Sequence, residues 1–403
     1  MPITKSLSLL IAVLAVLFIC VACCETDESK SKNNKNNYNN QYVVGEHRKD
    51  KVKNEDVFEI NMEATEALPK EDKGSATSLT QQADDLYADE KLLASARILR
   101  QIVSSSNSST DVLTSQHHTI LSQATDCESL IQQLIAPPKT KSATSSSSSG
   151  EEWNKLGERH DGKHSSMIYY KIVNSTNLMT RIETPIPPSL LVPLLSVLNE
   201  TELYSTWLPY YKKPFHLGVS SSTKLQQKSR VSQVIKVEVD VPWPFAKREV
   251  VIDAVALDDI EETGRIALRM VTPKSDGDIV PYPKKGVLRQ EFEGGFLFLK
   301  CPSDHPSLVD KNGKRGEGED KILVYFFMSI DDKKLHLFPQ AIINFVTRIV
   351  IGKAWDMFLH VAEEIKDGKR PDHSAAIEEK KEVLYNWVDE RIDAMFERMK
   401  SAE

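Results

Sequence analysis

The sequence predicts an α+β protein in which a strongly curved antiparallel sheet wraps around a long C-terminal helix, preceded by an α-helical hairpin. Three observations predict it. Apolar residues recur at helical spacing over 81–137, they alternate with polar residues over most of 166–330, and a broad apolar helical face follows Pro339. Strands in succession followed by a helix are typical of an α+β domain. The 403 residues, 40% hydrophobic and 27% charged, have an ordinary globular composition.

Residues 1–24 predict a targeting segment. One positive charge at Lys5 precedes the apolar run Leu7–Cys24, which suits either a cleaved signal peptide or an uncleaved signal anchor; a buried helix is the third alternative. In both membrane cases the rest of the chain enters the lumen. We therefore expect a glycoprotein of the secretory pathway (ER lumen, endomembrane or secreted), an expectation that agrees with sequons at Asn107, Asn174 and Asn199.

The next segments differ sharply in composition. Residues 25–80 are rich in Lys, Asn, Glu and Ser and predict a disordered polar tail. Residues 81–137 predict two amphipathic helices, separated by a Ser-Asn break at 104–109, that form a hairpin packed on the larger domain or on a partner. Residues 138–150 form a Ser-rich linker that marks a domain boundary.

A run of strands follows the linker. Alternation predicts them at 166–173, 178–186, 231–241, 248–257, 265–272, 286–300 and 321–330, with a short helix opened by Pro187-Pro188. Gly294-Gly295 predicts a bulge or sharp bend within the strand at 286–300.

Two helices end the chain. The first begins at Pro339 and continues to about Asp367, where Gly368 and Pro371 stop it. The second is more charged and occupies residues 374–403, with an apolar stripe of Leu384, Trp387, Val388, Ile392, Met395 and Phe396. Cys127 and Cys301 remain after cleavage near Cys23 or Cys24; because they fall in different predicted domains, we expect two isolated buried thiols.

Four short segments resemble the START lipid-binding domains, which have a helix-grip fold. They are 203–210, with a tryptophan before a proline; 241–249, a proline-aromatic turn leading to an arginine; 286–290, an arginine-bearing strand; and 338–346, the start of the closing helix. Their order and spacing place a START-like domain at 151–371. The chain departs from the pattern in the charged Asp331–Lys334 and in the extra helix after Ser374.

The resemblance implies a non-enzymatic domain that holds one lipid or sterol in an internal cavity, and whose closing helix moves at a membrane surface. The expected partners are that ligand, a transient membrane contact and a protein bound by the helical hairpin. The net charge of −7 argues against a nucleic-acid partner. We find no catalytic motif or metal-ligand spacing and expect no cofactor.

Arg248 and Arg289 are the polar groups expected nearest to the ligand, because a buried guanidinium needs an acidic side chain or a ligand head group. The alternative is a structural ion pair with a strand neighbour such as Glu249 or Glu291.

Aromatic residues at strand spacing either line the pocket or form plain core. The candidates are Trp207, Trp243, Phe296, Phe298, Tyr325 and Phe327. On the closing helix, Phe345, Ile349 and Trp355 are expected to cover the cavity and contact the ligand.

Two rival functions stay open at this point. In the first, the START-like domain is an interaction scaffold whose hairpin or final helix binds a partner, and side chains fill its cavity. In the second, the cavity is the active site of an enzyme for a hydrophobic substrate, which predicts acid-base groups with shifted pKa values facing the void.

Overall fold

The computed structural model describes residues 76–105, 113–140, 152–159, 164–174, 176–208, 210–212, 216–240, 246–275, 277–308, 321–331 and 351–401. The predicted targeting segment, most of the polar tail and the start of the helix after Pro339 lie outside these ranges. Within them, no helix is both long and apolar enough to cross a membrane.

The strands form one open sheet in the order β1-β2-β3-β11-β10-β8-β7-β6-β5-β4, in which all neighbours on this path are antiparallel; β9 pairs with β7 in parallel. The strands are β1 (Asn154–Arg159), β2 (Ser166–Val173), β3 (Asn177–Ile186), β4 (Tyr210–Tyr211), β5 (Leu217–Ser229), β6 (Ser232–Asp240), β7 (Lys247–Asp259), β8 (Arg265–Val271), β9 (Val287–Arg289), β10 (Glu293–Lys300) and β11 (Ile322–Asp331).

The helices lie before, between and after the strands. They are α2 (Ala76–Ala88), α3 (Leu92–Ser105), α4 (Ser115–Ile135), α5 (Leu191–Asn199), α6 (Tyr204–Trp207), α7 (Ile260–Thr263), α9 (Gly352–Lys366), α10 (Pro371–Glu379) and α11 (Asn386–Ser401). Short 3₁₀ turns η2, η3 and η4 cover Pro188–Leu190, Thr201–Leu203 and Pro306–Leu308, and a π turn, η7, covers Lys381–Tyr385.

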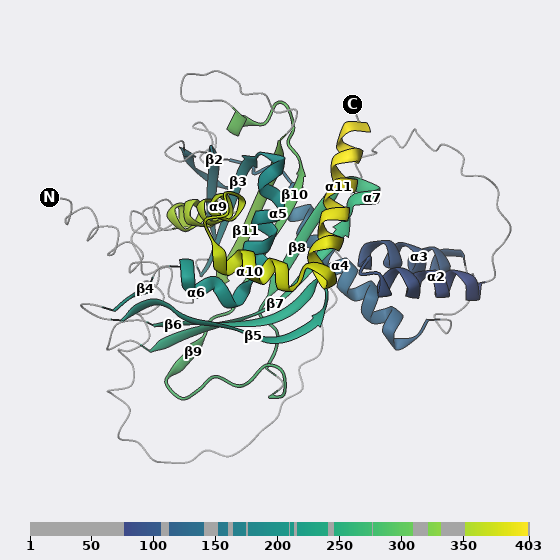
Figure 1. Ribbon diagram of the computed structural model, residues 1–403. Coiled ribbons are helices and arrows are strands. Elements are labelled where there is room, and N and C mark those ends of the chain that lie inside the picture. The colour runs from purple at the N-terminus through teal and green to yellow at the C-terminus, as the bar shows by residue number, and fades with distance from the viewer. Residues whose placement is uncertain are drawn as a thin grey trace, which may run out of the picture.

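The inner face of the sheet packs against α5, α9 and α11. Its core includes Ile182 and Phe298 from the strands and Trp355 and Phe358 from α9. Figure 1 shows α5 and α9 in front of the upright strands β2, β3 and β11, while β5–β7 sweep beneath α6 and α10. A twisted antiparallel sheet with a C-terminal helix against its inner face confirms the predicted α+β helix-grip class.

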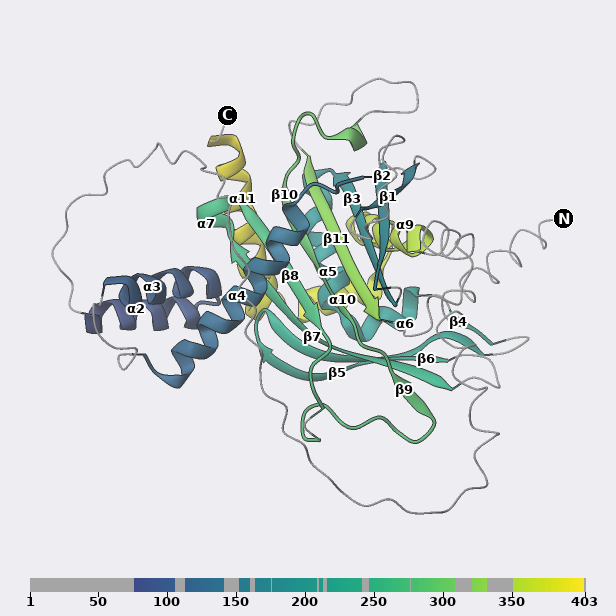
Figure 2. The same ribbon diagram turned by 180° about the vertical axis from the view of Figure 1, so that it is seen from behind.

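The outer face of the sheet is covered by the N-terminal helices. α4 contacts β8, β10 and β11, and α3 contacts β7; Figure 2 shows α4 crossing the back of these strands. The helices share one buried cluster with Leu297, Leu323 and Tyr325 of the sheet. The predicted packing of the helical segment on the larger domain is therefore confirmed.

Several predicted boundaries are wrong. The first helix of the hairpin is two helices, α2 and α3, broken where Glu90 has a φ of 65°. The predicted final helix is α10, η7 and α11. Residues 286–300 form two strands, β9 and β10, rather than one.

The glycine pair of β10 is not a bulge, because the ladder to β8 and β11 runs through it without a register shift. Instead, glycine is required by close packing. A Cβ at Gly295 would overlap the carbonyl oxygen of Leu268 and lie 2.6 Å from Cδ2 of Leu130 on α4. A Cβ at Gly294 would overlap the carbonyl oxygen of Phe327.

Both cysteines are buried free thiols, as predicted, although they belong to one cluster rather than to separate domains. Burial raises the pKa of Cys127 to about 11 and that of Cys301 to about 12. Because only the thiolate reacts, we expect neither residue to be alkylated by iodoacetamide at pH 8 in the native protein, and both to react fully in denaturant. Peptide mapping by mass spectrometry checks this; rapid native alkylation of either site would contradict its placement.

Candidate ligand cavity

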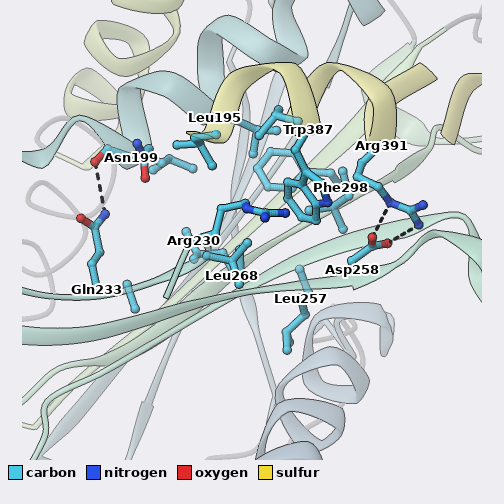
Figure 3. Close-up of a pocket in the computed structure, with 18 of the residues that line it drawn as sticks. Leu195, Asn199, Arg230, Gln233, Leu257, Asp258, Leu268, Phe298, Trp387 and Arg391 are labelled. Carbon is cyan, nitrogen blue, oxygen red and sulfur yellow. Dashed lines mark hydrogen bonds and ion pairs between the residues drawn. The ribbon is translucent and has the colours of Figure 1, made fainter. Parts of the chain in front are cut away.

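The structure contains a cavity between the inner face of β6–β8 and the C-terminal segment. Its volume is about 130 Å³. The C-terminal end of α5 and the first residue of η3, Thr201, close one side, and η7 and α11 form the roof (Figure 3). The extra helix after Ser374, which departs from the START pattern, is thus one wall of the cavity.

The floor of the cavity is apolar because the inward positions of three strands are apolar. Ile235 of β6, Ala254 and Ala256 of β7, and Leu268 and Met270 of β8 line it. Strand alternation brings these residues to one face. The two alanines lie next to larger side chains, for Ala254 pairs with Gln233 and Met270 across the ladders. Their small size leaves space that a larger residue would fill.

The roof comes from the apolar stripe predicted for the last helix. Leu384, Trp387, Val388 and Ile392 all line the cavity. Figure 3 shows Trp387 on the roof side of the cavity and Leu268 on the floor side. The stripe therefore covers the cavity as well as the core.

One polar anchor holds the π turn at the end of α5. The buried carboxylate of Glu200 accepts hydrogen bonds from the Tyr385 hydroxyl at 2.7 Å and from Asn199 Nδ2 at 2.9 Å, and it forms an ion pair with Lys380. Burial, with the neighbouring Glu200 charge, raises the pKa of the Tyr385 phenol. The phenol stays protonated and serves as a donor. Lys380 precedes the π turn and Tyr385 ends it, so this carboxylate binds both ends of the break between α10 and α11.

A second anchor fixes α11 to the end of β7. Nε of Arg391 lies 2.5 Å from Oδ2 of Asp258, and Nη2 of Arg391 donates a hydrogen bond to Oδ1 of Asp258 at 3.1 Å. The Asp258 side chain is 7% exposed, so its charge needs this partner. Further along the helix, the Arg398 guanidinium donates to the carbonyl oxygens of Glu261 and Glu262 at 2.6 and 2.5 Å.

Four buried polar atoms of the lining form no hydrogen bond with the described residues. Two of them, Oδ2 of Asp258 and Nε of Arg391, face each other in the ion pair, whereas Oγ1 of Thr201 and Oε1 of Gln233 have no such partner. Gln233 Nε2 donates to the Asn199 carbonyl oxygen at 3.2 Å, which fixes the amide at the cavity wall. Buried polar atoms without partners are uncommon in folded proteins, and here they offer hydrogen bonds to the contents of the cavity.

The predicted aromatic residues separate into two faces of the sheet. Phe298 lines the cavity. Phe296 and Trp355 stack at 6.2 Å between ring centroids beside it, and Trp207 lies 6.4 Å from Phe358, so these three belong to the core under α9. Trp355 donates from Nε1 to Thr184 Oγ1 at 2.9 Å.

Tyr325 and Phe327 face away from the cavity, which corrects their assignment to it. Both belong to the cluster under the N-terminal helices. Alternation along β11 places them opposite the inward Val324 and Phe326. Trp243, Phe345 and Ile349 lie outside the described residues.

Arg248 and Arg289 do not belong to the lining of this cavity. Arg289 donates to Glu249 Oε1 at 2.7 Å from Nη2, and to Ser275 Oγ at 2.6 Å from Nη1. This is the structural ion pair that the sequence left open as the alternative. Arg248 is buried and donates to the Ala246 carbonyl oxygen at 3.2 Å.

Sequence reasoning missed the residues that close the cavity, Arg230 and Arg391 among them. The apolar stripe of 384–396 was visible, but nothing in the sequence indicates which strand it packs on. The guanidinium of Arg230, in the turn between β5 and β6, lies 5.1 Å from the centroid of the Trp387 ring.

A Ser-His-Glu constellation lies on the other face of the sheet. His305 Nδ1 is 2.6 Å from Ser307 Oγ, and its Nε2 is 3.0 Å from Glu183 Oε2. Ser307 is 3% exposed, and none of the three lines the cavity. The backbone N–H of Ser307 also points to His305 Nδ1, as in a local turn. These contacts close a buried polar network and present no accessible nucleophile. Across the described ranges, no three His, Cys, Asp or Glu side chains gather as a metal site.

No family model matches the sequence, and no curated protein matches it. Solved structures similar to it include human STARD10 (14% identity, 61% of this chain and 82% of that one, TM-score 0.42). Another is human StAR-related lipid transfer protein 5, with 12% identity over 60% of this chain and 97% of that one and a TM-score of 0.39. A third is a STAR-related lipid transfer protein fragment from Xanthomonas axonopodis, with 17% identity over 53% of this chain and 99% of that one and a TM-score of 0.36.

All three TM-scores are below 0.5, so these likenesses carry no argument about ligand or activity. The helix-grip arrangement of the described residues is the fold expected from the resemblance of the four sequence segments.

Proposed function

We propose that this protein binds the apolar part of a lipid or similar amphiphile in the cavity beneath α11 and transfers it between membranes without chemical change. The observation that carries the proposal is an apolar cavity whose roof is a separate C-terminal segment. That segment is fastened at Glu200 and Asp258 by polar contacts, and its apolar stripe faces the void.

The size of the cavity indicates that the roof must move. Typical ligand pockets measure roughly 300–1,000 Å³, and a cavity of about 150 Å³ holds one benzene. The volume of about 130 Å³ is therefore too small for a whole lipid. Displacing α11 enlarges it without disturbing the sheet. Val383 of the π turn, 69% exposed, offers an apolar contact for a membrane at the same end of the segment.

Binding is a better account of this site than catalysis because the carboxylate and the phenols of the lining already have partners. Asp258 is paired with Arg391, and Tyr385 donates to Glu200. Burial raises the pKa of Tyr204, whose hydroxyl donates to the Leu198 carbonyl oxygen at 3.0 Å. Because the pKa values of Tyr204 and Tyr385 are raised, both phenols keep their protons at neutral pH. The scaffold alternative predicts no ligand uptake at all.

Residence in the secretory pathway remains a proposal. Of the sequons whose asparagines the structure describes, Asn174 is exposed in a turn, whereas Asn199 lines the cavity and is bonded to Glu200. Asn174 is the better candidate for a glycan.

Loosening the roof tests the mechanism. We expect Arg391→Ala to accelerate uptake of a fluorescent fatty acid about tenfold, because losing a charged hydrogen-bonded pair favours opening by about 1.4 kcal/mol. Stopped-flow fluorescence measures the rate. Glu397→Ala is the matched control on α11, since its contact with Lys400 is exposed. Equal rates in all three proteins would show that α11 does not gate the cavity.

A further inference from the structure

Arg230 occupies the rim of the cavity in a fixed position. Its backbone N–H donates to Glu90 Oε1 at 3.1 Å, and the adjacent Ser229 hydroxyl donates to Glu90 Oε2 at 2.9 Å. Glu90, at the break between α2 and α3, thus holds the turn between β5 and β6 in place through hydrogen bonds to that turn. The guanidinium of Arg230 takes no part in these contacts.

The guanidinium points into the cavity. Figure 3 shows it beneath Trp387 and above Leu268, inside the ring of lining side chains. Its contact with the Trp387 ring is a cation-π interaction at 5.1 Å. The carboxylate nearest along the lining, Asp258, is already bound by Arg391. Among the described residues, no carboxylate forms an ion pair with the Arg230 guanidinium.

We propose that the Arg230 guanidinium binds the anionic head group of a single-chain amphiphile whose hydrocarbon chain enters the cavity. This inference rests on the proposed function and names its ligand class. A guanidinium presents donors in a planar fork that matches a carboxylate or a phosphate in two parallel hydrogen bonds. Most of the residues that line the cavity with it are apolar, Leu268, Val388 and Phe298 among them. The small volume favours one alkyl chain over two.

Neighbouring charge supports an anion rather than a cation at this rim. Two acidic groups in this part of the molecule, Glu200 and Asp253, are paired with Lys380 and Lys228. The carboxylate of Glu90 lies at the same turn, where its two oxygens accept hydrogen bonds from the Arg230 backbone N–H and the adjacent hydroxyl rather than from the guanidinium. The guanidinium is therefore left for an anionic group of the ligand.

The test compares dodecanoate, dodecyl phosphate and dodecanol, which share one chain and differ in the head group. Isothermal titration of the full chain gives each Kd for the wild type, Arg230→Ala, Arg230→Lys and the control Lys236→Ala, a lysine of the same hairpin that pairs with Glu238 and does not line the cavity. We expect Arg230→Ala to weaken binding of one or both anions about 10- to 100-fold. Dodecanol should change less than about twofold, and Arg230→Lys should restore part of the anion affinity. The more strongly affected anion identifies the head group.

The outcomes separate the two proposals. If the wild type binds dodecanol and the anions equally and Arg230→Ala changes none of them, the head-group assignment is wrong while the binding function stands. If Arg230→Ala weakens all three alike, Arg230 only supports Trp387, and the assignment is also wrong. If the wild type binds none of the three, the binding function itself fails.

Discussion

Ala254→Trp is expected to abolish ligand binding while the protein remains folded. Ala254 lies on the inner face of β7, between Gln233 and Met270, in the middle of the cavity floor. An indole placed there occupies the space of about 130 Å³ that the ligand needs. Overpacking a core costs about 1–3 kcal/mol, which a domain with this much buried sheet tolerates.

Fluorescent fatty-acid titration measures the loss, and circular dichroism with thermal unfolding confirms the fold. Thr223→Trp on β5, which β6 separates from β7, is the matched control, because Thr223 is exposed and does not line the cavity. It should bind like the wild type. Undiminished binding by Ala254→Trp would mean that the ligand lies elsewhere.

Arg181→Ala is expected to lower the free energy of unfolding by about 3–5 kcal/mol, the usual cost of breaking a buried ion pair. Arg181 Nε lies 2.6 Å from Glu183 Oε1, with side-chain exposures of 3% and 5%. Its Nη1 also donates to the carbonyl oxygens of Gln133 and Ala136 at 3.2 and 2.8 Å, at the C-terminal end of α4. Removal leaves Glu183 charged and buried, and it leaves the end of α4 without its donor.

Urea denaturation followed by tryptophan fluorescence measures this change. Arg269→Ala offers a matched control, since it breaks another contact between α4 and the sheet, the exposed pair with Asp126 at 3.4 Å. Exposed pairs contribute about 0–1 kcal/mol. Similar small losses in both variants would contradict the view that α4 is integral to the core.

The fold could be predicted because the apolar residues of most elements have the spacing of a strand or of a helix in the sequence. In β6, Gln233 and Ile235 face inward, as their period of two predicted. β5 was missed because Ser220–Ser222, Lys224 and Gln226–Gln227 give no apolar alternation, and its long partner β6 supplies the pairing instead. The break at Glu90 carries no glycine or proline, so local propensity gave no signal.

The site was less predictable because it depends on contacts between distant segments. Arg289 and Arg230 look alike in sequence, but only the second lies at the cavity, since Glu249 on the neighbouring β7 binds the first. Strand spacing alone does not indicate whether Tyr325 and Phe327 face the cavity or the opposite side of the sheet. They face the opposite side, where they pack in one cluster with residues of α4. Trp387 and Val388 cover the cavity because their segment is bound to Glu200 and Asp258, which lie far away in the chain.

Native mass spectrometry of the full chain purified from eukaryotic cells, followed by extraction of any bound molecule, tests the central claim most directly. The account predicts a one-to-one adduct with the mass of a lipid or amphiphile, and its absence in Ala254→Trp prepared in parallel. A wild-type protein that carries no adduct and takes up none of the dodecyl probes would contradict it, and the function would then lie in partners of the helical segments.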